Sequence, residues 1–155
     1  TSRGYKHLVC VTDQYSRYVT AWPTATITAE AIARKFHEKI ICVHGDPKRL
    51  VSDNGSAFIS DLMAEMCKLY GIKHNFGTPY HPQSQGGVER AQKSIVSLLR
   101  TFVNEKQSNW AEYLPSVVWA LNTTESQSVG LSPFTLIYGR LPVSPADIDV
   151  PEAFE

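Results

Sequence analysis

The sequence predicts a single α/β domain in which a mixed sheet is flanked by helices. Three observations support this fold class: short apolar, β-branched runs lie in the first half of the chain, amphipathic helical patterns alternate with them, and helical patterns dominate afterwards. The chain has 155 residues, of which 43% are hydrophobic. A domain of this size buries roughly 70% of its unfolded surface, so one hydrophobic core can stabilise it without disulfide bonds or structural metal ions.

The first two strands are expected to pair as a hairpin. Residues 5–11 form a short apolar run, residues 13–17 have the composition of a turn, and residues 18–22 resume an alternating pattern. Pro23 is expected to end the second strand. A helix should then begin after Thr28, which suits an N-cap. The apolar residues of this helix recur at helical spacing, at Ile32, Phe36 and Ile40.

A strand, a helix and another strand follow. Residues 48–52 predict a strand that leads into Asp53, Ser60 suits an N-cap, and Gly71 suits the C-terminal end of the helix. The helix is expected to present one apolar face, formed by Leu62, Met66 and Leu69. Residues 72–76 predict the next strand.

Two long helices are expected in the second half, after a polar loop over residues 78–87 in which Gly86 and Gly87 would allow flexing. The apolar stripe of the first helix consists of Val88, Ala91, Ile95, Leu98 or Leu99, and Phe102. Asn109 and Glu112 resemble a capping box for the second helix. Its core-facing residues are expected to be Tyr113, Leu114, Val117, Val118 and Leu121. After Asn122 the chain is expected to be loop-like.

Composition narrows the function classes only slightly. Fifteen Lys and Arg balance fifteen Asp and Glu, so the net charge gives no support to a nucleic-acid partner, although a local basic stripe would suffice. Cys10, Cys42 and Cys67 are widely spaced without a CxxC arrangement, which indicates reduced, mostly buried thiols. No apolar run approaches a membrane span, so a soluble intracellular protein with no membrane partner is expected.

Asp53 and Glu89 are the candidates for chemistry. Asp53 opens an Asp-Asn-Gly sequence, which by itself also predicts an ordinary turn. Glu89 lies on the polar side near the start of the long helix, where a solvated glutamate is also common. Thirty-five residues separate the two, and the intervening strand, helix and strand would return the chain to the same sheet edge. Together they would bind divalent cations, with a third carboxylate needed to bridge two ions.

Three segments resemble the integrase core of retroelements, namely LVSDNGSAFIS, TPYHPQSQGGVERAQKSI and NTTESQSVGLSPFTLIYGRLP. The last is similar to gypsy-type LTR retrotransposon integrases, and retroviral and foamy-virus integrases are similar but more distant. The resemblance covers residues 5–146. It implies a ribonuclease H-like fold with a five-stranded mixed sheet between helices, of which the first strand is missing or incomplete in this chain.

The resemblance also implies DNA integration by a polynucleotidyl transferase. The family enzyme trims the 3′ ends of the element's DNA and joins the exposed 3′-hydroxyl to target DNA, at an Asp, Asp, Glu triad that holds two Mg²⁺ or Mn²⁺. Asp53 matches the second aspartate and Glu89 matches the glutamate. The neighbours that it implies for holding DNA are Asn54, Ser56, Tyr80, Gln83, Gln85 and Lys93. Gln83 and Gln85 also fit a reading as plain polar loop residues.

The first aspartate of the triad is the departure from the family pattern. In the family it lies about fifty or more residues before the second, and only fifty-two residues precede Asp53 here. Asp13 is the one substitute, but its place in the hairpin favours a turn role. The first carboxylate is therefore expected upstream of residue 1, and this polypeptide, a fragment or a decayed or domesticated copy, is expected to show little or no catalysis.

Two readings of function stay open at this point. The chain belongs either to an active integrase or to a domesticated module that binds nucleic acid or protein, and a related nuclease or transposase core is a more distant option. Residues 1–141 are expected to form the partial catalytic core and residues 142–155 a tail or linker. The resemblance further implies double-stranded DNA as partner, a homodimer or larger assembly through the helices near Phe36 and Val117, and action in the nucleus.

Overall fold

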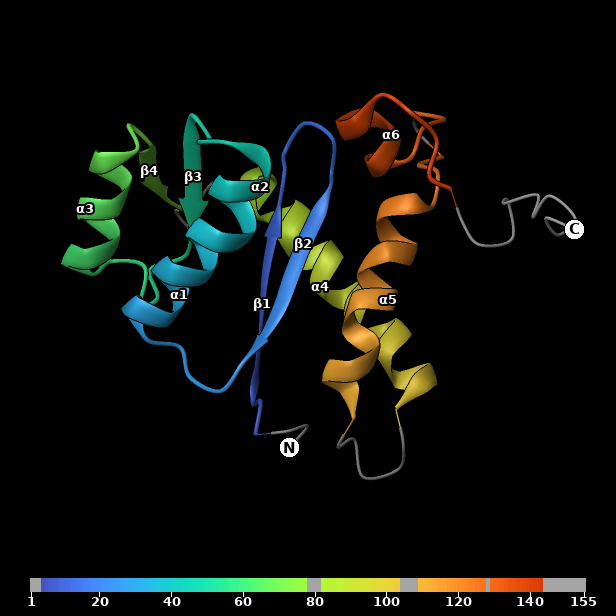
Figure 1. Cartoon of the computed structure of the whole chain (residues 1–155), viewed down its shortest axis with the longest axis horizontal. Helices are drawn as coiled ribbons and strands as arrows, with labels where there is room; N and C mark the ends of the chain where they lie inside the picture. The colour runs from blue at the N-terminus through green and yellow to red at the C-terminus, as the bar shows by residue number, and fades with distance from the viewer. Residues whose placement is uncertain (1–3, 78–81, 104–108, 128, 144–155) are drawn as a thin grey trace, which may run out of the picture.

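The computed structural model describes residues 4–77, 82–103, 109–127 and 129–143, with backbone alone for residues 82–85. Its strands and helices form an α/β arrangement in which helices cover both sides of a central layer of strands (Figure 1). In chain order they are β1 His7–Thr12, β2 Val19–Thr24, α1 Ala29–Phe36, the π-helical turn η1 His37–Ile41, α2 Cys42–His44, β3 Arg49–Ser52, α3 Asp61–Leu69, β4 Lys73–Phe76, α4 Pro82–Phe102, α5 Trp110–Thr123 and α6 Pro133–Tyr138.

The predicted hairpin is confirmed. β1 and β2 pair antiparallel, and the turn between them is fixed by Asp13, whose carboxylate Oδ2 accepts from both the backbone N–H and the hydroxyl of Ser16, each at 2.7 Å. Pro23 does not end the second strand, since it pairs opposite Leu8 within β2. The prediction was wrong because, among the described residues, β2 pairs on one side only, and an edge strand tolerates a residue without an N–H.

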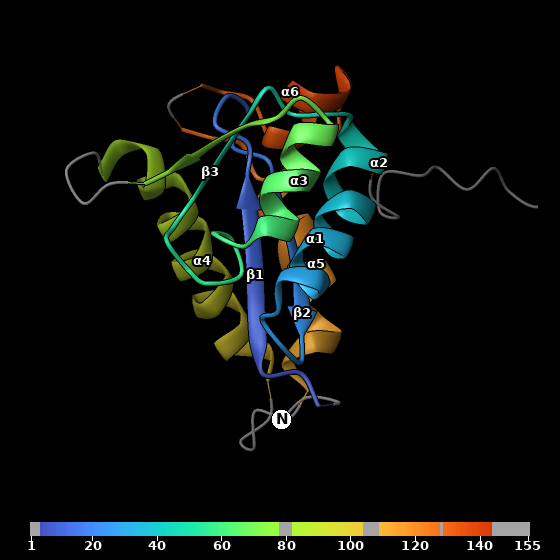
Figure 2. The ribbon, with the colours of Figure 1, turned by 90° about the vertical axis from the view of Figure 1, so that its left-hand side faces the viewer.

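The described strands form two pairs rather than a five-stranded sheet. β3 and β4 are parallel, and among the described residues neither pair is bonded to the other. Both strand pairs nevertheless pack against the same hydrophobic cluster. Val9 of β1 and Leu50 of β3 contact this cluster, which includes Ile32 and Met63. The helix α4 contacts both β1 and β3. Figure 2 shows α1 and α4 on opposite sides of β1.

Helix α1 agrees with its prediction, whereas α3 presents a different face. Thr28 caps α1 by accepting from the Ala31 backbone N–H at 3.3 Å. The predicted apolar residues of this region are all buried, at Ile32, Phe36 and Ile40. In α3 the buried residues are Met63 and Cys67, while Leu62 and Leu69 are exposed. Met66 is partly buried, so the buried face of α3 consists of Met63, Met66 and Cys67. This face is rotated relative to the predicted one of Leu62, Met66 and Leu69.

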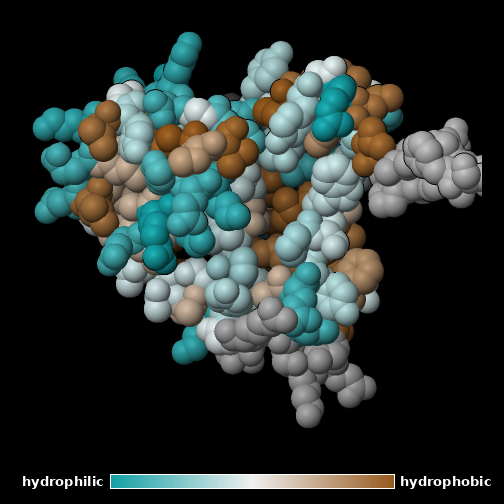
Figure 3. Space-filling view, in the orientation of Figure 1, coloured by the Kyte–Doolittle hydropathy of each residue, from teal (hydrophilic) through white to brown (hydrophobic). Residues whose placement is uncertain are grey.

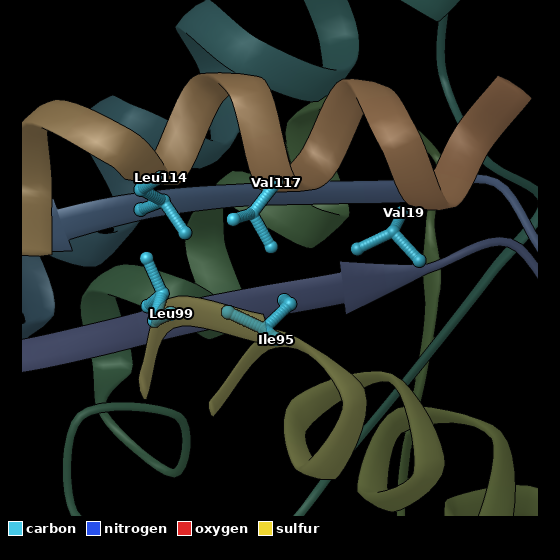
Figure 4. Close-up of a cluster of buried hydrophobic side chains, with 5 residues drawn as sticks. All are labelled: Val19, Ile95, Leu99, Leu114 and Val117. Carbon is cyan, nitrogen blue, oxygen red and sulfur yellow. The ribbon is translucent and has the colours of Figure 1, made fainter. Parts of the chain in front are cut away.

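The main core lies between α4, α5 and the hairpin. Ile95 and Leu99 of α4 meet Leu114 and Val117 of α5 against Val19 of β2 (Figure 4). Phe102 and Tyr113, which were predicted to face the core, are partly exposed and stack on each other with ring centroids 5.9 Å apart. They lie at the ends of their helices, since Phe102 is the last residue of α4 and Tyr113 is in the first turn of α5.

Helix α4 begins five residues earlier than the end of the predicted loop. Residues 82–87 are helical, including Gly86 and Gly87, so these glycines do not form a flexible segment ahead of the helix. Pro82 explains the early start, because its fixed backbone angle and missing N–H suit the first turn of a helix. The segment before it, residues 78–81, lies outside the described residues.

The region after Asn122 is not wholly loop-like, because it contains α6. Ser132 caps this helix by accepting from the Thr135 backbone N–H at 3.1 Å, and Pro133 occupies its first turn. Gly139 ends it with a φ of 65°. Apolar side chains gather over α6 at the upper right of Figure 3. The exposed members of this region include Leu131, Ile137, Tyr138 and Leu141.

The cysteines are free thiols, as predicted, but only Cys67 is fully buried, and Cys42 is exposed. Within the described residues, no helix combines the length and the apolar character needed to cross a membrane.

Candidate metal and nucleic-acid site

Asp53 follows the last residue of β3 and is exposed. Its carboxylate Oδ1 accepts a hydrogen bond of 2.9 Å from the Gly55 backbone N–H. The Gly55 carbonyl in turn accepts from the backbone N–H groups of Phe58 and Ile59 at 2.8 and 3.2 Å. The Asp-Asn-Gly sequence therefore does form a turn, and this turn holds one carboxylate oxygen while the side chain stays open to solvent.

The absence of a side chain at Gly55 leaves the space that the Asp53 carboxylate occupies. A Cβ added at Gly55 would lie 2.9 Å from Asp53 Oδ1 and 3.4 Å from a ring carbon of Phe58. Carbon and oxygen atoms that are not bonded do not approach to 2.9 Å without one of them moving. A side chain at residue 55 would therefore displace the Asp53 carboxylate from this position.

A second set of contacts holds the backbone at Asp53. Ser52 Oγ donates to the Asp53 carbonyl oxygen at 2.9 Å and lies 2.9 Å from His74 Nε2 on β4. The Ser52 carbonyl accepts from the Gly77 N–H at 2.7 Å, one step beyond the β3–β4 ladder. The His74 ring packs on Phe76 with centroids 4.4 Å apart. Partial burial lowers the pKa of His74 below its ordinary value of 6.5.

Glu89 is an exposed residue of α4, the helix that contacts both β1 and β3. It lines one end of an open groove of about 390 Å³ whose other lining residues are Gln92, Lys93, Val96, Ser97 and Arg100. Among the described residues, no group of three His, Cys, Asp or Glu side chains is close enough to form a metal cluster. Joint binding of a cation by Asp53 and Glu89 therefore stays a prediction.

The residues predicted to hold DNA fall into three groups. Asn54 and Ser56 are exposed beside Asp53, and Lys93 is exposed one turn after Glu89 in the groove along α4. Tyr80 lies outside the described residues. Gln83 and Gln85 belong to the first turns of α4 and not to a loop, and their side chains also lie outside the described part.

Asp13 is not placed as a substitute for the missing first aspartate. Its Oδ2 is taken by two hydrogen bonds from Ser16, and its backbone closes the turn by donating to the Tyr18 carbonyl and accepting from the Arg17 N–H. The turn role favoured by its position in the sequence is confirmed.

Besides the close approach at Gly55, two contacts between distant residues of the site were not predicted from the sequence. The Ser52–His74 contact joins residues 22 positions apart and depends on the parallel register of β3 and β4. Arg17, at a φ of 64° in the hairpin turn, reaches α4, since a Cβ added at Gly87 would lie 3.1 Å from its Nη1. This places a guanidinium beside the helix turn that carries Glu89.

Comparison with known proteins identifies relatives in retroelement polyproteins. The chain matches the integrase core domain family over residues 1–82. It is 38% identical over 140 residues to the Gag-Pol polyprotein of feline leukemia virus, 36% over 138 residues to the Pro-Pol polyprotein of simian foamy virus type 1, and 30% over 149 residues to the Tf2-3 transposon polyprotein of Schizosaccharomyces pombe. These alignments cover 90%, 89% and 95% of the chain but only 8%, 12% and 11% of the polyproteins.

Solved structures that superpose on this chain include retroviral integrases. The catalytic core domain of BIV integrase superposes with a TM-score of 0.73 at 26% identity and covers 85% of each chain. The HTLV-2 integrase catalytic core in complex with magnesium gives 0.71 at 24% over 84% of each chain. The simian T-cell lymphotropic virus intasome gives 0.72 at 23% over 95% of this chain and 51% of that one. The predicted ribonuclease H-like fold is thereby confirmed.

The resemblance to integrase cores that the sequence motifs suggested is therefore supported by both comparisons, although a gypsy-type assignment within that group stays a prediction. Because the match to the integrase core domain covers more than half of the residues of this chain, the chain belongs to the integrase core domain family.

Proposed function

We propose that this chain is the greater part of the catalytic core of an enzyme that integrates retroelement DNA, through trimming of 3′ ends and strand transfer. Membership of the integrase core domain family supports the proposal. The observation that carries it is the placement of two carboxylates: Asp53 is exposed and held at the end of β3, and Glu89 is exposed on the helix that contacts β3.

The donor chemistry fits a hard divalent cation in part. Asp53 and Glu89 offer carboxylate oxygens, which Mg²⁺ and Mn²⁺ prefer, and Asp53 Oδ2 makes no hydrogen bond within the described residues. A related integrase core was solved in complex with magnesium. When bound, two such ions supply charge stabilisation for the oxygens of an in-line phosphoryl transfer. The contribution of this chain would be to present the two carboxylates in fixed positions and to hold the DNA beside them.

The third carboxylate is proposed to come from a strand upstream of residue 1. Among the described residues, β1 and β3 each pair with one strand only, and both strand pairs contact one hydrophobic cluster. A strand placed between β1 and β3 would complete a five-stranded sheet and bring its side chains close to Asp53. Without that ligand, the isolated polypeptide is expected to catalyse little strand transfer.

The proposed substrate is double-stranded DNA, both the element ends and the target. Lys93 would pair with a phosphate, and Asn54, Ser56, Tyr80, Gln83 and Gln85 would position sugar, phosphate or terminal bases. A homodimer or larger assembly and action in the nucleus complete the proposal. Phe36 and Val117, near which the subunit contact was predicted, are themselves buried in the core, so neighbouring exposed residues of α1 and α5 would have to form it.

Strand transfer by a polypeptide that includes the upstream coding sequence tests the proposal. We expect Mg²⁺-dependent joining of an element-end oligonucleotide to target DNA, and loss of at least 10²-fold in Asp53→Asn and Glu89→Gln, since electrostatic stabilisation of that size is typical of such groups. Glu65→Gln, an exposed glutamate of α3, is the matched control and should retain activity. Absence of strand transfer by the intact parent would instead favour a domesticated, noncatalytic module.

A further inference from the structure

We propose that His74 and Ser52 form a hydrogen-bonded support that fixes the backbone at Asp53, which makes His74 a positioning residue for the Asp53 carboxylate. This inference rests on the proposed function, because it takes Asp53 to be a metal ligand. His74 would touch neither metal nor DNA. Its effect would pass through Ser52, the residue directly before Asp53 in the chain.

The direction of the hydrogen bonds follows from counting protons. Ser52 Oγ carries a single proton and lies 2.9 Å from the Asp53 carbonyl oxygen, which has no proton to give. The hydroxyl must therefore donate to that carbonyl. The same Oγ lies 2.9 Å from His74 Nε2, so it accepts there, and His74 must carry its proton on Nε2. The order is His74 Nε2–H to Ser52 Oγ–H to the Asp53 carbonyl.

The surroundings of His74 hold its ring in the orientation that this chain of bonds requires. The ring packs on Phe76, the next residue on the same face of β4, with an interplanar angle of 47°. The β3–β4 ladder sets the register, with Leu50 opposite His74 and Ser52 opposite Phe76. The imidazole thus lies diagonally across from Ser52. It reaches the Ser52 hydroxyl from β4, which is held in place by its pairing with β3.

Asp53 is consequently held on two sides by independent contacts. The Ser52–His74 support fixes the Asp53 carbonyl, and the Gly55 N–H fixes the carboxylate Oδ1. A rotation of the peptide between residues 53 and 54 would break the first contact and shift the second. Loss of the support should therefore loosen the turn at residues 53–55 and weaken cation binding, while leaving the core in place.

The experiment compares four substitutions, one control and one double variant in the 155-residue chain. His74→Ala and Ser52→Ala remove the support, whereas His74→Gln retains an N–H donor and Ser52→Thr retains the hydroxyl. His37→Ala is the matched control, because His37 is also beside an aromatic ring, that of Tyr70, with centroids 5.8 Å apart, and among the described residues its other side-chain contact is with Cys42 Sγ at 3.7 Å. The readouts are the tautomer of His74 from long-range ¹H–¹⁵N spectra, hydrogen exchange of the Gly55 amide, and Mn²⁺ broadening of the amides at residues 53–55.

The expected result is a His74 tautomer protonated on Nε2 in the unsubstituted chain. In His74→Ala and Ser52→Ala, Gly55 exchange should accelerate and the Mn²⁺ dissociation constant should rise, each about fivefold, which is the effect of one neutral hydrogen bond. His74→Gln and Ser52→Thr should restore both values to within about twofold on the same scale. The double alanine variant should be no worse than either single one, because both break one chain of bonds.

Several outcomes would overturn the inference. A proton on Nδ1 would reverse the hydrogen bond, and equal behaviour of His74→Gln and His74→Ala would show that the donor is irrelevant. Unchanged hydrogen exchange of the Gly55 amide in His74→Ala would show that His74 does not support the turn at residues 53–55. If Mn²⁺ broadens no amide near Asp53 even in the unsubstituted chain, Asp53 does not bind the ion without the third carboxylate, while the tautomer and the exchange rates still decide the support.

Discussion

Gly55 determines where the Asp53 carboxylate can lie, because a methyl group at residue 55 would occupy the space of Asp53 Oδ1. We predict that Gly55→Ala leaves the fold intact and displaces the carboxylate, since the clashing atom is the end of a movable side chain. The Mn²⁺ dissociation constant should rise about tenfold, on the scale of a charge-assisted contact of about 1.5 kcal/mol. Paramagnetic broadening of the amides at residues 53–55 measures it. Unaltered Mn²⁺ binding would show that the carboxylate has another suitable position.

His74 should also give the folded chain a pH dependence. Burial lowers its pKa below 6.5, so the unfolded chain takes up a proton as the pH falls through 6.5 while the folded chain does not. His74 therefore costs stability as the pH falls from 6.5 towards its lowered pKa, and it has no such effect above 6.5. Urea midpoints at pH 7.5 and 5.5 should differ less in His74→Gln than in the unsubstituted chain. An equal difference would contradict the prediction.

Single residues with a local role were predictable from the sequence. Thr28 and Ser60 were recognised as N-caps and Asp13 as a turn residue, because a cap or a turn depends on neighbours within four positions. The roles of Gly55 and His74 were not predicted. The first depends on a side-chain position that the Asp-Asn-Gly sequence does not specify, and the second on strand register across 22 residues.

At the scale of elements, α5 is joined to β2 by one buried side chain. Asn122, only 2% exposed, accepts from the Val19 N–H and donates to the Val19 carbonyl, both at 2.8 Å, as a neighbouring strand would. We predict that Asn122→Ala destabilises the fold by about 2–4 kcal/mol, because it leaves two buried backbone groups without partners. Urea unfolding measures the change. Thr123→Ala removes an exposed hydroxyl that is bonded within its own helix, so it should cost far less stability. Similar losses of stability in both variants would show that the bonds from Asn122 to Val19 are not important.

The elements themselves were mostly predictable, and the errors have physical causes. The strands and the long helices follow from periodicity, which reports local burial. The face of α3 was misplaced because Leu62 and Leu69 are apolar yet exposed, so hydrophobicity alone did not fix its rotation. The start of α4 was obscured by glycines, and α6 by its length, although Ser132-Pro133 and Gly139 mark its two ends as cap, first turn and C-terminal stop.

At the scale of the whole molecule, the fold class was predictable but the way the sheet divides was not. A mixed α/β domain follows from the order of strand and helix patterns. The division into two strand pairs depends on which edges meet in space, and local hydrophobic periodicity does not report that. The same holds for the site, since residue spacing predicted that Asp53 and Glu89 converge, yet only the contact of α4 with β3 supports it here.

The net charge of the chain limits how it could bind DNA. The chain has a formal net charge of zero, so its affinity for DNA must come from local cations and not from the molecule as a whole. Lys93 and Arg100 line one groove along α4, and within the described part of the chain neither is in an ion pair. Each is therefore available to a phosphate.

We expect DNA binding to weaken with salt, and Lys93→Ala to reduce the slope of log K against log salt by about 0.9, the value for one phosphate contact on duplex DNA. Arg100→Ala should do the same if DNA follows the whole groove. Both losses should be equal on element-end and scrambled duplexes, because phosphate contacts carry no base information. Lys68→Ala, on α3 across the strand layer from α4, is the charge-matched control, measured by fluorescence anisotropy over a salt series. An equal change of slope in Lys68→Ala would mean that DNA is held by diffuse charge, and the groove along α4 would lose its assignment.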